Sequence, residues 1–163
     1  MKRIFIAIIL IATFQQADAQ SDSIPIYKRF PVVPVFSIMT APDSIKFTKD
    51  DLKRRKATII ILFSPDCGHC QIATKDLLNH IDLFKKTQII MVSSMDFSHI
   101  KNFYEEYKIA DQPNITMGRD AAYFLGTFYK ITSFPSIYVY NKKGKFVEAF
   151  QGDVKMETVA ESL

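Results

Sequence analysis

Residues 57–70 have the sequence ATIIILFSPDCGHC, which contains the only two cysteines of the chain. The first seven of these residues are apolar and rich in β-branched side chains, a pattern that predicts a buried strand. A Ser-Pro-Asp sequence then ends the strand, and residues 71–85 carry apolar side chains at helical spacing. Cys67 and Cys70 are therefore predicted to lie where a buried strand turns into a helix.

The spacing of the two cysteines indicates chemistry rather than a structural cross-link. A disulfide stabilises a fold mainly by closing a loop in the unfolded chain, and a bridge from Cys67 to Cys70 would close almost none. Two thiols so close together are suited to exchanging a disulfide with another molecule. We therefore interpret the pair as redox-active.

Position within the predicted helix distinguishes the two thiols. Cys67 lies at the helix start, where free backbone N–H groups and the helix dipole favour the thiolate, so it is the predicted nucleophile. Cys70 lies one turn inside the helix and is predicted to resolve a mixed disulfide by attacking the sulfur of Cys67. Between them, Gly68 allows close approach of a substrate backbone. His69, as an imidazolium, would stabilise the thiolate and make the disulfide a stronger oxidant.

The first 19 residues have the pattern of a secretory signal peptide. Lys2 and Arg3 form a basic start, residues 4–14 are apolar apart from one threonine, and residues 17–19 form a small-x-small cleavage site. The apolar stretch is shorter than the roughly 20 residues that span a bilayer, which favours cleavage over an uncleaved anchor. We expect a mature chain that begins at Gln20 and is periplasmic or secreted. Membrane contact is expected only if the signal segment stays uncleaved.

Length and composition indicate a single globular domain. The chain has 163 residues, of which 48% are apolar and 23% charged, enough for one core. We divide it into the signal peptide at 1–19, an extended lead-in at 20–33 and a folded domain at 34–163.

Charge gives little indication of a nucleic-acid partner. The net charge is only +4, and the basic residues are scattered except for a short cluster at 53–55. Nucleic-acid binding would need a concentrated basic patch interleaved with aromatic side chains. We therefore expect no nucleic-acid partner and interpret the lysines as solvated surface residues.

The apolar pattern predicts an α/β sandwich with both parallel and antiparallel strand pairing. Strands are predicted at 34–38, 45–47, 57–63, 88–94, 136–140 and 145–150. Helices are predicted at 68–85, 98–108, 120–129 and 153–163, with a brief one from Thr48 to Arg54 that Asp51 would cap. Residues 111–118 are expected to be irregular, and 141–144 to form a hairpin turn.

With these elements in place, the chain resembles the thioredoxin superfamily, and within it the exported TlpA-like thiol–disulfide oxidoreductases, or redoxins. The matching segments are 34–38, 63–70, 134–136, the hairpin at 141–144 and Gly152 before the last helix. The resemblance runs from about Pro34 to the C-terminus. It implies a thioredoxin-like fold, with a central mixed sheet flanked by helices and short strands at the N-terminal side.

The resemblance also implies further features of the site. Family members hold a cis proline that faces the dithiol, and the matching residue is Pro135. Phe134, just before it, would line the substrate groove. The implied partners are cysteine-containing exported proteins and a redox partner protein, and no cofactor or metal ion is expected.

The chain departs from the family pattern at two places. Thioredoxins carry a buried carboxylate six residues before the first cysteine, where this chain has Ile61, so the usual acceptor for the proton of Cys70 is missing. Most TlpA-like members have an aromatic and small-residue stretch before the first cysteine, where this chain has residues 64–66.

The direction of electron flow stays open. His69 favours oxidation or isomerisation, whereas the resemblance to TlpA-like proteins favours reduction, which is our leading hypothesis.

Two other functions were weighed against this one. A thiol peroxidase of the peroxiredoxin kind would have a threonine three residues before its cysteine, where this chain has Ser64. A copper chaperone could bind copper(I) through the thiolates of Cys67 and Cys70, with His69 as a further ligand. Related copper carriers, however, place three residues between their cysteines. Zinc would need a second ligand pair, which the sequence does not offer.

Overall fold

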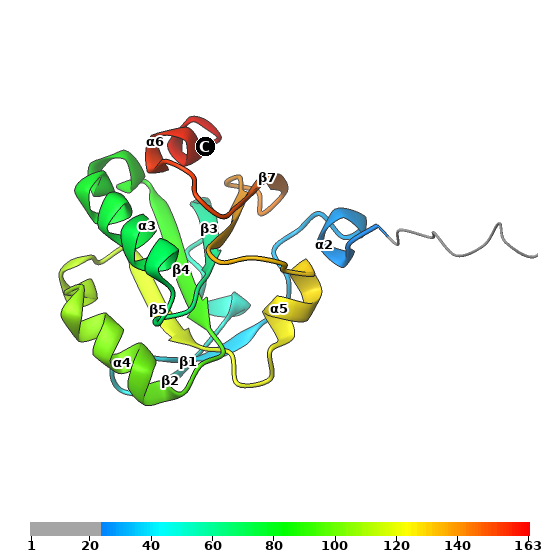
Figure 1. Ribbon diagram of the computed structural model, residues 1–163. Helices are drawn as coiled ribbons and strands as arrows, with labels where there is room; N and C mark the ends of the chain where they lie inside the picture. The colour runs from blue at the N-terminus through cyan, green and yellow to red at the C-terminus, as the bar shows by residue number, and fades with distance from the viewer. Residues whose placement is uncertain (1–23) are drawn as a thin grey trace, which may run out of the picture.

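The computed structural model describes residues 24–163, which form a seven-stranded mixed sheet covered by helices (Figure 1). The predicted signal peptide and the start of the lead-in lie outside these residues. The strands are β1 (Ser37–Thr40), β2 (Ile45–Thr48), β3 (Ala57–Leu62), β4 (Thr87–Ser93), β5 (Ile115–Arg119), β6 (Ser136–Tyr140) and β7 (Phe146–Gln151). Their order across the sheet is β2-β1-β5-β4-β3-β6-β7. The predicted α/β fold with mixed pairing is confirmed.

The three central strands are completely buried. β3 pairs with β4 in parallel and with β6 in antiparallel orientation. Every residue of β3, β4 and β6 is buried, because helices cover both faces of the sheet at this point. This double burial explains why these strands are continuous apolar runs and do not alternate with polar residues.

The helices divide between the two faces of the sheet (Figure 1). On one face lie α3 (Gly68–Asn79), α4 (Phe97–Glu106) and α6 (Met156–Glu161), and on the other α2 (Ile26–Arg29) and α5 (Phe124–Tyr129). Short 3₁₀ turns occupy η2 (Lys49–Asp51), η3 (Ile81–Phe84) and η4 (Ile109–Asp111). Successive β3 residues alternate between the faces, so Ile59 and Ile61 contact the α3 side and Ile60 and Leu62 the α5 side.

Three segments differ most clearly from the sequence prediction, and in addition β1 begins at Ser37 instead of residue 34 and α5 at Phe124 instead of residue 120. The helix predicted at 68–85 ends at Asn79 and continues only as the separate turn η3. The segment expected to be irregular contains β5, which forms because β4 and β1 pair with it on either side. The lead-in, expected to be extended, makes one helical turn at α2, where Tyr27 is buried against the rings of Tyr129 and Tyr138. The strand β5 and the turn α2 depend on partners distant in sequence.

Within residues 24–163, no helix combines the length and the apolar character that crossing a bilayer requires.

A cluster of polar side chains joins the end of α3 to the start of α6. His80 Nδ1 lies 3.0 Å from an oxygen of Asp76, and His80 Nε2 lies 3.0 Å from Glu157 Oε1. The second carboxylate oxygen of Asp76 accepts a hydrogen bond of 2.9 Å from the Met156 N–H. The Asp76 backbone carbonyl, followed by the charges of Glu157 and Asp76, raises the pKa of His80 above its ordinary value of 6.5.

This contact predicts a pH-dependent contribution of His80 to stability. A raised pKa in the folded state means that the protonated form stabilises the fold, fully below about pH 6.5 and less as the pH rises through the folded-state pKa. We expect His80→Gln to lower the free energy of unfolding more at pH 5.5 than at pH 8.5, measured by urea denaturation. Lys75→Gln, at an exposed position on the same helix, is the control. A difference that stays constant or grows with pH would contradict this prediction.

Candidate functional site

The strand-to-helix junction at the dithiol forms as the sequence predicted. β3 ends at Leu62, and Cys67 is the N-cap residue of α3. The turn between them is closed by a hydrogen bond of 3.1 Å from the Cys67 N–H to the Ser64 carbonyl. The Gln71 side chain donates a further bond of 3.0 Å to the Pro65 carbonyl. The turn therefore holds Cys67 at the beginning of the helix, just beyond the C-terminal end of the central strand β3.

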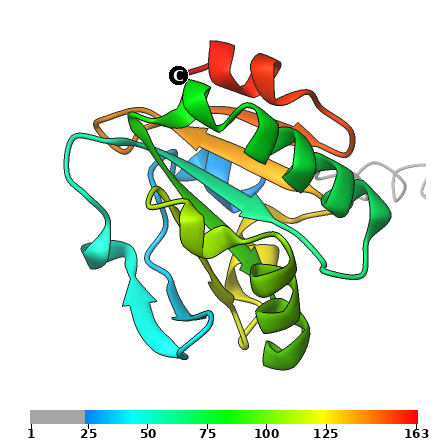
Figure 2. The same ribbon diagram turned by 90° about the vertical axis from the view of Figure 1, so that its left-hand side faces the viewer.

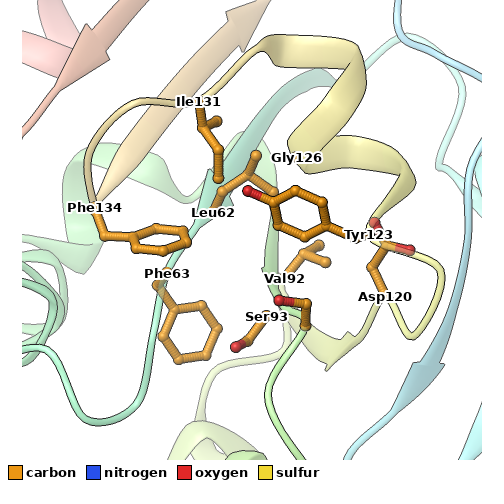
Figure 3. Close-up of a pocket in the computed structure, with 10 residues that line it drawn as sticks. Leu62, Phe63, Val92, Ser93, Asp120, Tyr123, Gly126, Ile131 and Phe134 are labelled. Atoms are coloured by element: carbon orange, nitrogen blue, oxygen red, sulfur yellow. The ribbon is translucent and has the colours of Figure 1, made fainter.

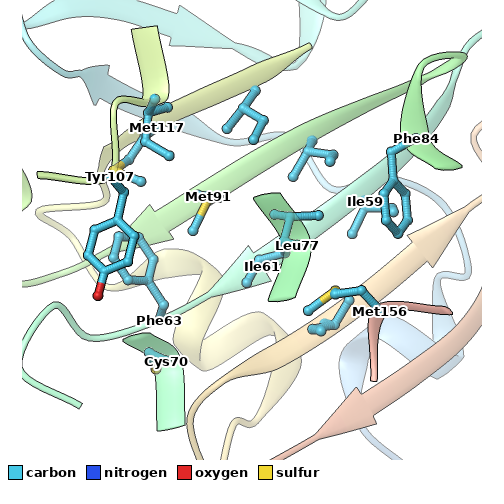
Figure 4. Close-up of a cluster of buried hydrophobic side chains, with 14 of the residues drawn as sticks. Ile59, Ile61, Phe63, Cys70, Leu77, Phe84, Met91, Tyr107, Met117 and Met156 are labelled. Atoms are coloured by element: carbon cyan, nitrogen blue, oxygen red, sulfur yellow. The ribbon is translucent and has the colours of Figure 1, made fainter. Parts of the chain in front are cut away.

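The two thiols occupy different environments. Both are free, but Cys67 is half-buried, whereas Cys70 is only 1% exposed. Figure 4 shows Cys70 at the margin of the core cluster, close to Phe63. Ile61 and Met156 line the same small apolar gap. Burial is the largest cause that raises the pKa of Cys70 to about 12, and the neighbouring Cys67 thiol raises it further, against a hydrogen bond from the Ser64 backbone.

The Phe134–Pro135 segment lies against the dithiol. Its peptide bond is cis, as the resemblance implied. The segment precedes β6, and because Ser136 pairs with Leu62 in the β3–β6 ladder, the fold brings it to the end of β3. The Cys67 thiol donates a long hydrogen bond of 4.0 Å to the Phe134 carbonyl. Phe134 is half-buried and Pro135 is buried beside Cys70.

A second, small hollow is lined by Phe134 and Tyr123, which face each other across it (Figure 3). Asp120 is buried there, and its carboxylate accepts a hydrogen bond of 2.7 Å from the Leu125 N–H. Gly126 lies under the Tyr123 ring, where an added Cβ would come within 2.4 Å of a ring carbon. The sequence pattern placed Tyr123 among core aromatic residues of a predicted helix and gave no signal for Asp120 or Gly126, which the tertiary structure brings to Phe134.

Two histidine–aspartate pairs flank the dithiol. His69 Nδ1 lies 2.8 Å from Asp153 Oδ1, and both side chains are exposed. His99 Nδ1, at the start of α4, lies 3.2 Å from Asp66 Oδ2. Asp153 and His99 come from distant parts of the chain and were not predicted near the cysteines. In the sequence, Asp153 is marked only by its position directly after Gly152, a residue that matches the family pattern. In the structure, the Gly152 N–H donates a hydrogen bond of 2.8 Å to the Pro135 carbonyl, which brings Asp153 to the dithiol.

One group among the described residues offers three potential metal ligands together. The donor atoms of Asp76, His80 and Glu157 lie within 4.8 Å of one another. The group lies at the end of α3 opposite to Cys67, and its members already pair with each other. We assign it to the contact between α3 and α6.

Comparison with known proteins identifies the family. Residues 46–163 match the family described as a thioredoxin-like domain. No curated protein matches the chain. Among solved structures, StoA from Bacillus subtilis is similar at 18% identity and a TM-score of 0.58, covering 80% of this chain and 97% of that one.

Two further structures have the same fold. A secreted disulfide oxidoreductase of Mycobacterium tuberculosis, homologous to E. coli DsbE, has 15% identity and a TM-score of 0.65, covering 78% of this chain and 92% of its own. A thiol-disulfide oxidoreductase from Bacteroides fragilis has 16% identity and a TM-score of 0.65, covering 81% of this chain and 99% of its own. These likenesses place the architecture among thioredoxin-like folds.

The difference between the thiols predicts unequal alkylation. With a pKa of about 12 and little exposure, Cys70 has almost no reactive thiolate at pH 8. We expect iodoacetamide to modify the folded Cys67→Ser variant at least about 100-fold more slowly than the Cys70→Ser variant. In 6 M urea the two rates should converge, which controls for intrinsic reactivity. Equal rates in the folded state would contradict the burial argument.

Proposed function

Because the chain belongs to the thioredoxin-like domain family, we propose that it exchanges disulfides with protein cysteines through Cys67 and Cys70. The observation that carries this proposal is the inequality of the two thiols. Cys67 is accessible at a helix start, where backbone N–H groups favour a thiolate. Cys70 is buried one turn away and stays protonated at neutral pH. One cysteine can attack a substrate, and the other is kept for the second step.

In the reducing direction the exchange has two balanced steps. The Cys67 thiolate attacks one sulfur of a substrate disulfide, forms a mixed disulfide and releases the other substrate sulfur as a thiolate. Cys70 then loses its proton and attacks the Cys67 sulfur, which closes the Cys67–Cys70 disulfide and releases the second substrate sulfur. The substrate gains two electrons. A dithiol partner protein restores the reduced pair by the reverse exchange.

The proton of Cys70 must leave without a neighbouring carboxylate. Ile61 occupies the position where thioredoxins carry one, and it lines the same apolar gap as Cys70. The substrate thiolate released in the first step is a base, and it forms in the site just before Cys70 has to lose its proton. We assign it the role of accepting the Cys70 proton.

The segment around Phe134 provides the surface on which a substrate chain would lie. The Phe134 carbonyl accepts the hydrogen bond from the Cys67 thiol. We infer that a substrate sulfur approaches Cys67 from the side on which this carbonyl lies. Pro135 presents no N–H beside the sulfurs. Gly68 is exposed, and a Cβ added there would meet nothing within 4 Å, which leaves open space next to Cys67.

The surroundings of His69 support reduction as the physiological direction. An imidazolium beside Cys67 would stabilise the thiolate and make the disulfide more oxidising. Asp153, 2.8 Å away, offsets that positive charge. Asp66, directly before Cys67, pairs with a second histidine and adds another negative charge at the site. We therefore propose a reductant of exported proteins, with the signal-peptide pattern and the secreted M. tuberculosis structure supporting export.

The proposed role as a reductant predicts a low reduction potential for the cysteine pair. We expect the Cys67–Cys70 couple to lie below about −200 mV, more reducing than protein disulfide isomerase at about −180 mV and towards thioredoxin at about −270 mV. Asp153→Asn should raise the potential, because removing this negative charge from the site favours the thiolate of the reduced form. Asp43→Asn, at an exposed turn between β1 and β2, is the matched control. Titration against glutathione or dithiothreitol measures all three proteins, and a wild-type potential above about −200 mV would favour the oxidant or isomerase alternative.

The division of roles predicts a trapped intermediate. Cys70→Ala lacks the resolving thiol, so we expect it to accumulate as a mixed disulfide with a disulfide-containing protein such as insulin. Cys67→Ala should form no such adduct, because its remaining thiol is buried. Non-reducing electrophoresis and mass spectrometry identify the bond. An adduct of equal amount through Cys70 in the second variant would refute the assignment.

A further inference from the structure

A strongly basic hollow lies at the end of the sheet opposite to the dithiol. It has a volume of about 430 Å³ and is formed by the loop before β3, the β6–β7 hairpin and part of the lead-in. We call it the basic groove. Its basic lining residues are Lys49, Lys53, Arg54, Arg55, Lys56, Lys142 and Lys143.

The fold assembles the basic groove from segments far apart in sequence. In the β3–β6 ladder, Thr58 pairs with Tyr140, so the hairpin at 141–144 lies beside the loop before β3. Figure 2 shows both loops at the same end of the sheet, with the N-terminus of α3 at the other end. The sequence alone showed only the cluster at 53–55, which we interpreted as solvated surface residues.

Hydrogen bonds hold both loops in place. The side chain of Gln88, only 7% exposed, accepts a bond of 2.8 Å from the Lys53 N–H and donates one of 3.1 Å to the Lys53 carbonyl. In the hairpin, Asn141 Oδ1 accepts bonds from the N–H groups of Lys143 and Lys145. The basic side chains therefore extend from a fixed backbone, which lowers the cost of ordering them on binding.

Among the described residues, no acidic side chain pairs with the cations of the basic groove. Its lining includes no acidic residue, and among residues 24–163 none of the seven basic side chains takes part in a salt bridge. Residues 24–163 carry 19 basic and 15 acidic side chains, so outside the groove their net charge is −3. The molecule is therefore electrically polarised, with its positive end away from Cys67.

The arrangement of the cations favours an extended anionic surface over a small anion. Five of the seven side chains are exposed, and only Lys49 and Lys56 are half-buried. A specific site for a small ligand encloses most of its surface and uses a few precisely placed polar groups. The lining also has no aromatic side chain on which nucleobases could stack, nor one that could anchor a protein interface.

We propose that the basic groove binds the surface of an anionic lipid bilayer. Lysine and arginine clusters are attracted to anionic headgroups, and this attraction needs no buried contact. β3, with six residues, separates the groove from the dithiol by roughly 20 Å of strand. A molecule held by its basic end therefore presents Cys67 away from the lipid, where partner proteins can reach it. This contact does not depend on whether the N-terminal segment is cleaved.

Vesicle sedimentation of the full chain tests the proposal. We expect binding to equimolar phosphatidylglycerol–phosphatidylcholine vesicles, weaker binding to pure phosphatidylcholine, and a difference that shrinks as salt rises from about 50 to 500 mM. The variant Arg54→Glu/Lys142→Glu/Lys143→Glu should lose at least about 100-fold in partitioning onto the anionic vesicles. Its matched control, Lys46→Glu/Lys75→Glu/Lys130→Glu, changes net charge equally at exposed positions outside the groove and should lose far less.

Both variants should keep the wild-type circular dichroism spectrum and the redox potential of the dithiol. A failure of the lipid proposal would therefore leave the proposed disulfide exchange untouched. Equal losses in the two triple variants would overturn the proposal, because net charge alone would then explain binding. Displacement from vesicles by millimolar inorganic phosphate at constant ionic strength would instead indicate a small-anion site. Binding to polyglutamate that is stronger than vesicle binding would indicate an acidic protein partner. Either of these results would overturn the assignment to lipid.

Discussion

The pairing of β3 with β6 is the contact on which both ends of the molecule depend. At one end, Leu62 opposite Ser136 brings the Phe134–Pro135 segment to the thiol of Cys67. At the other, Thr58 opposite Tyr140 brings the hairpin lysines to the basic loop before β3. A register shift by one residue would turn each buried side chain of β6 to the opposite face. Because β6 packs Ile137 and Val139 into one core and Tyr138 and Tyr140 into the other, such a shift would fit neither core, which fixes the register of the dithiol site and the basic groove.

Burial also sets the chemistry of the cysteines. Cys70 lies in the same apolar surroundings as Ile61 and belongs to the core, so its thiol resists ionisation. The first residue of α3 is Gly68, and Cys67 caps that helix at the surface. Three residues of helix are thus enough to separate an accessible sulfur from a protected one. A buried carboxylate at position 61 would help to remove the proton from Cys70, but it would carry the cost of burying a charged group in the core.

The charges are distributed along the same axis as the strands. Around the dithiol, the carboxylates of Asp153 and Asp66 pair with the imidazoles of His69 and His99. At the opposite end, the basic groove has no acidic partner among its lining residues. Redox chemistry and electrostatic attraction are therefore placed at different ends of one sheet.

Local pattern was sufficient for the central strand, the turn at residues 64–66, the helix start at Cys67 and the order of most elements. These features depend on neighbouring residues: apolar runs, proline and the free N–H groups of a helix terminus. Only the tertiary structure decided strand β5, the pairing of His69 with Asp153 and the assembly of the basic groove. Each joins segments that lie far apart in the chain, and only packing and strand register bring such segments together.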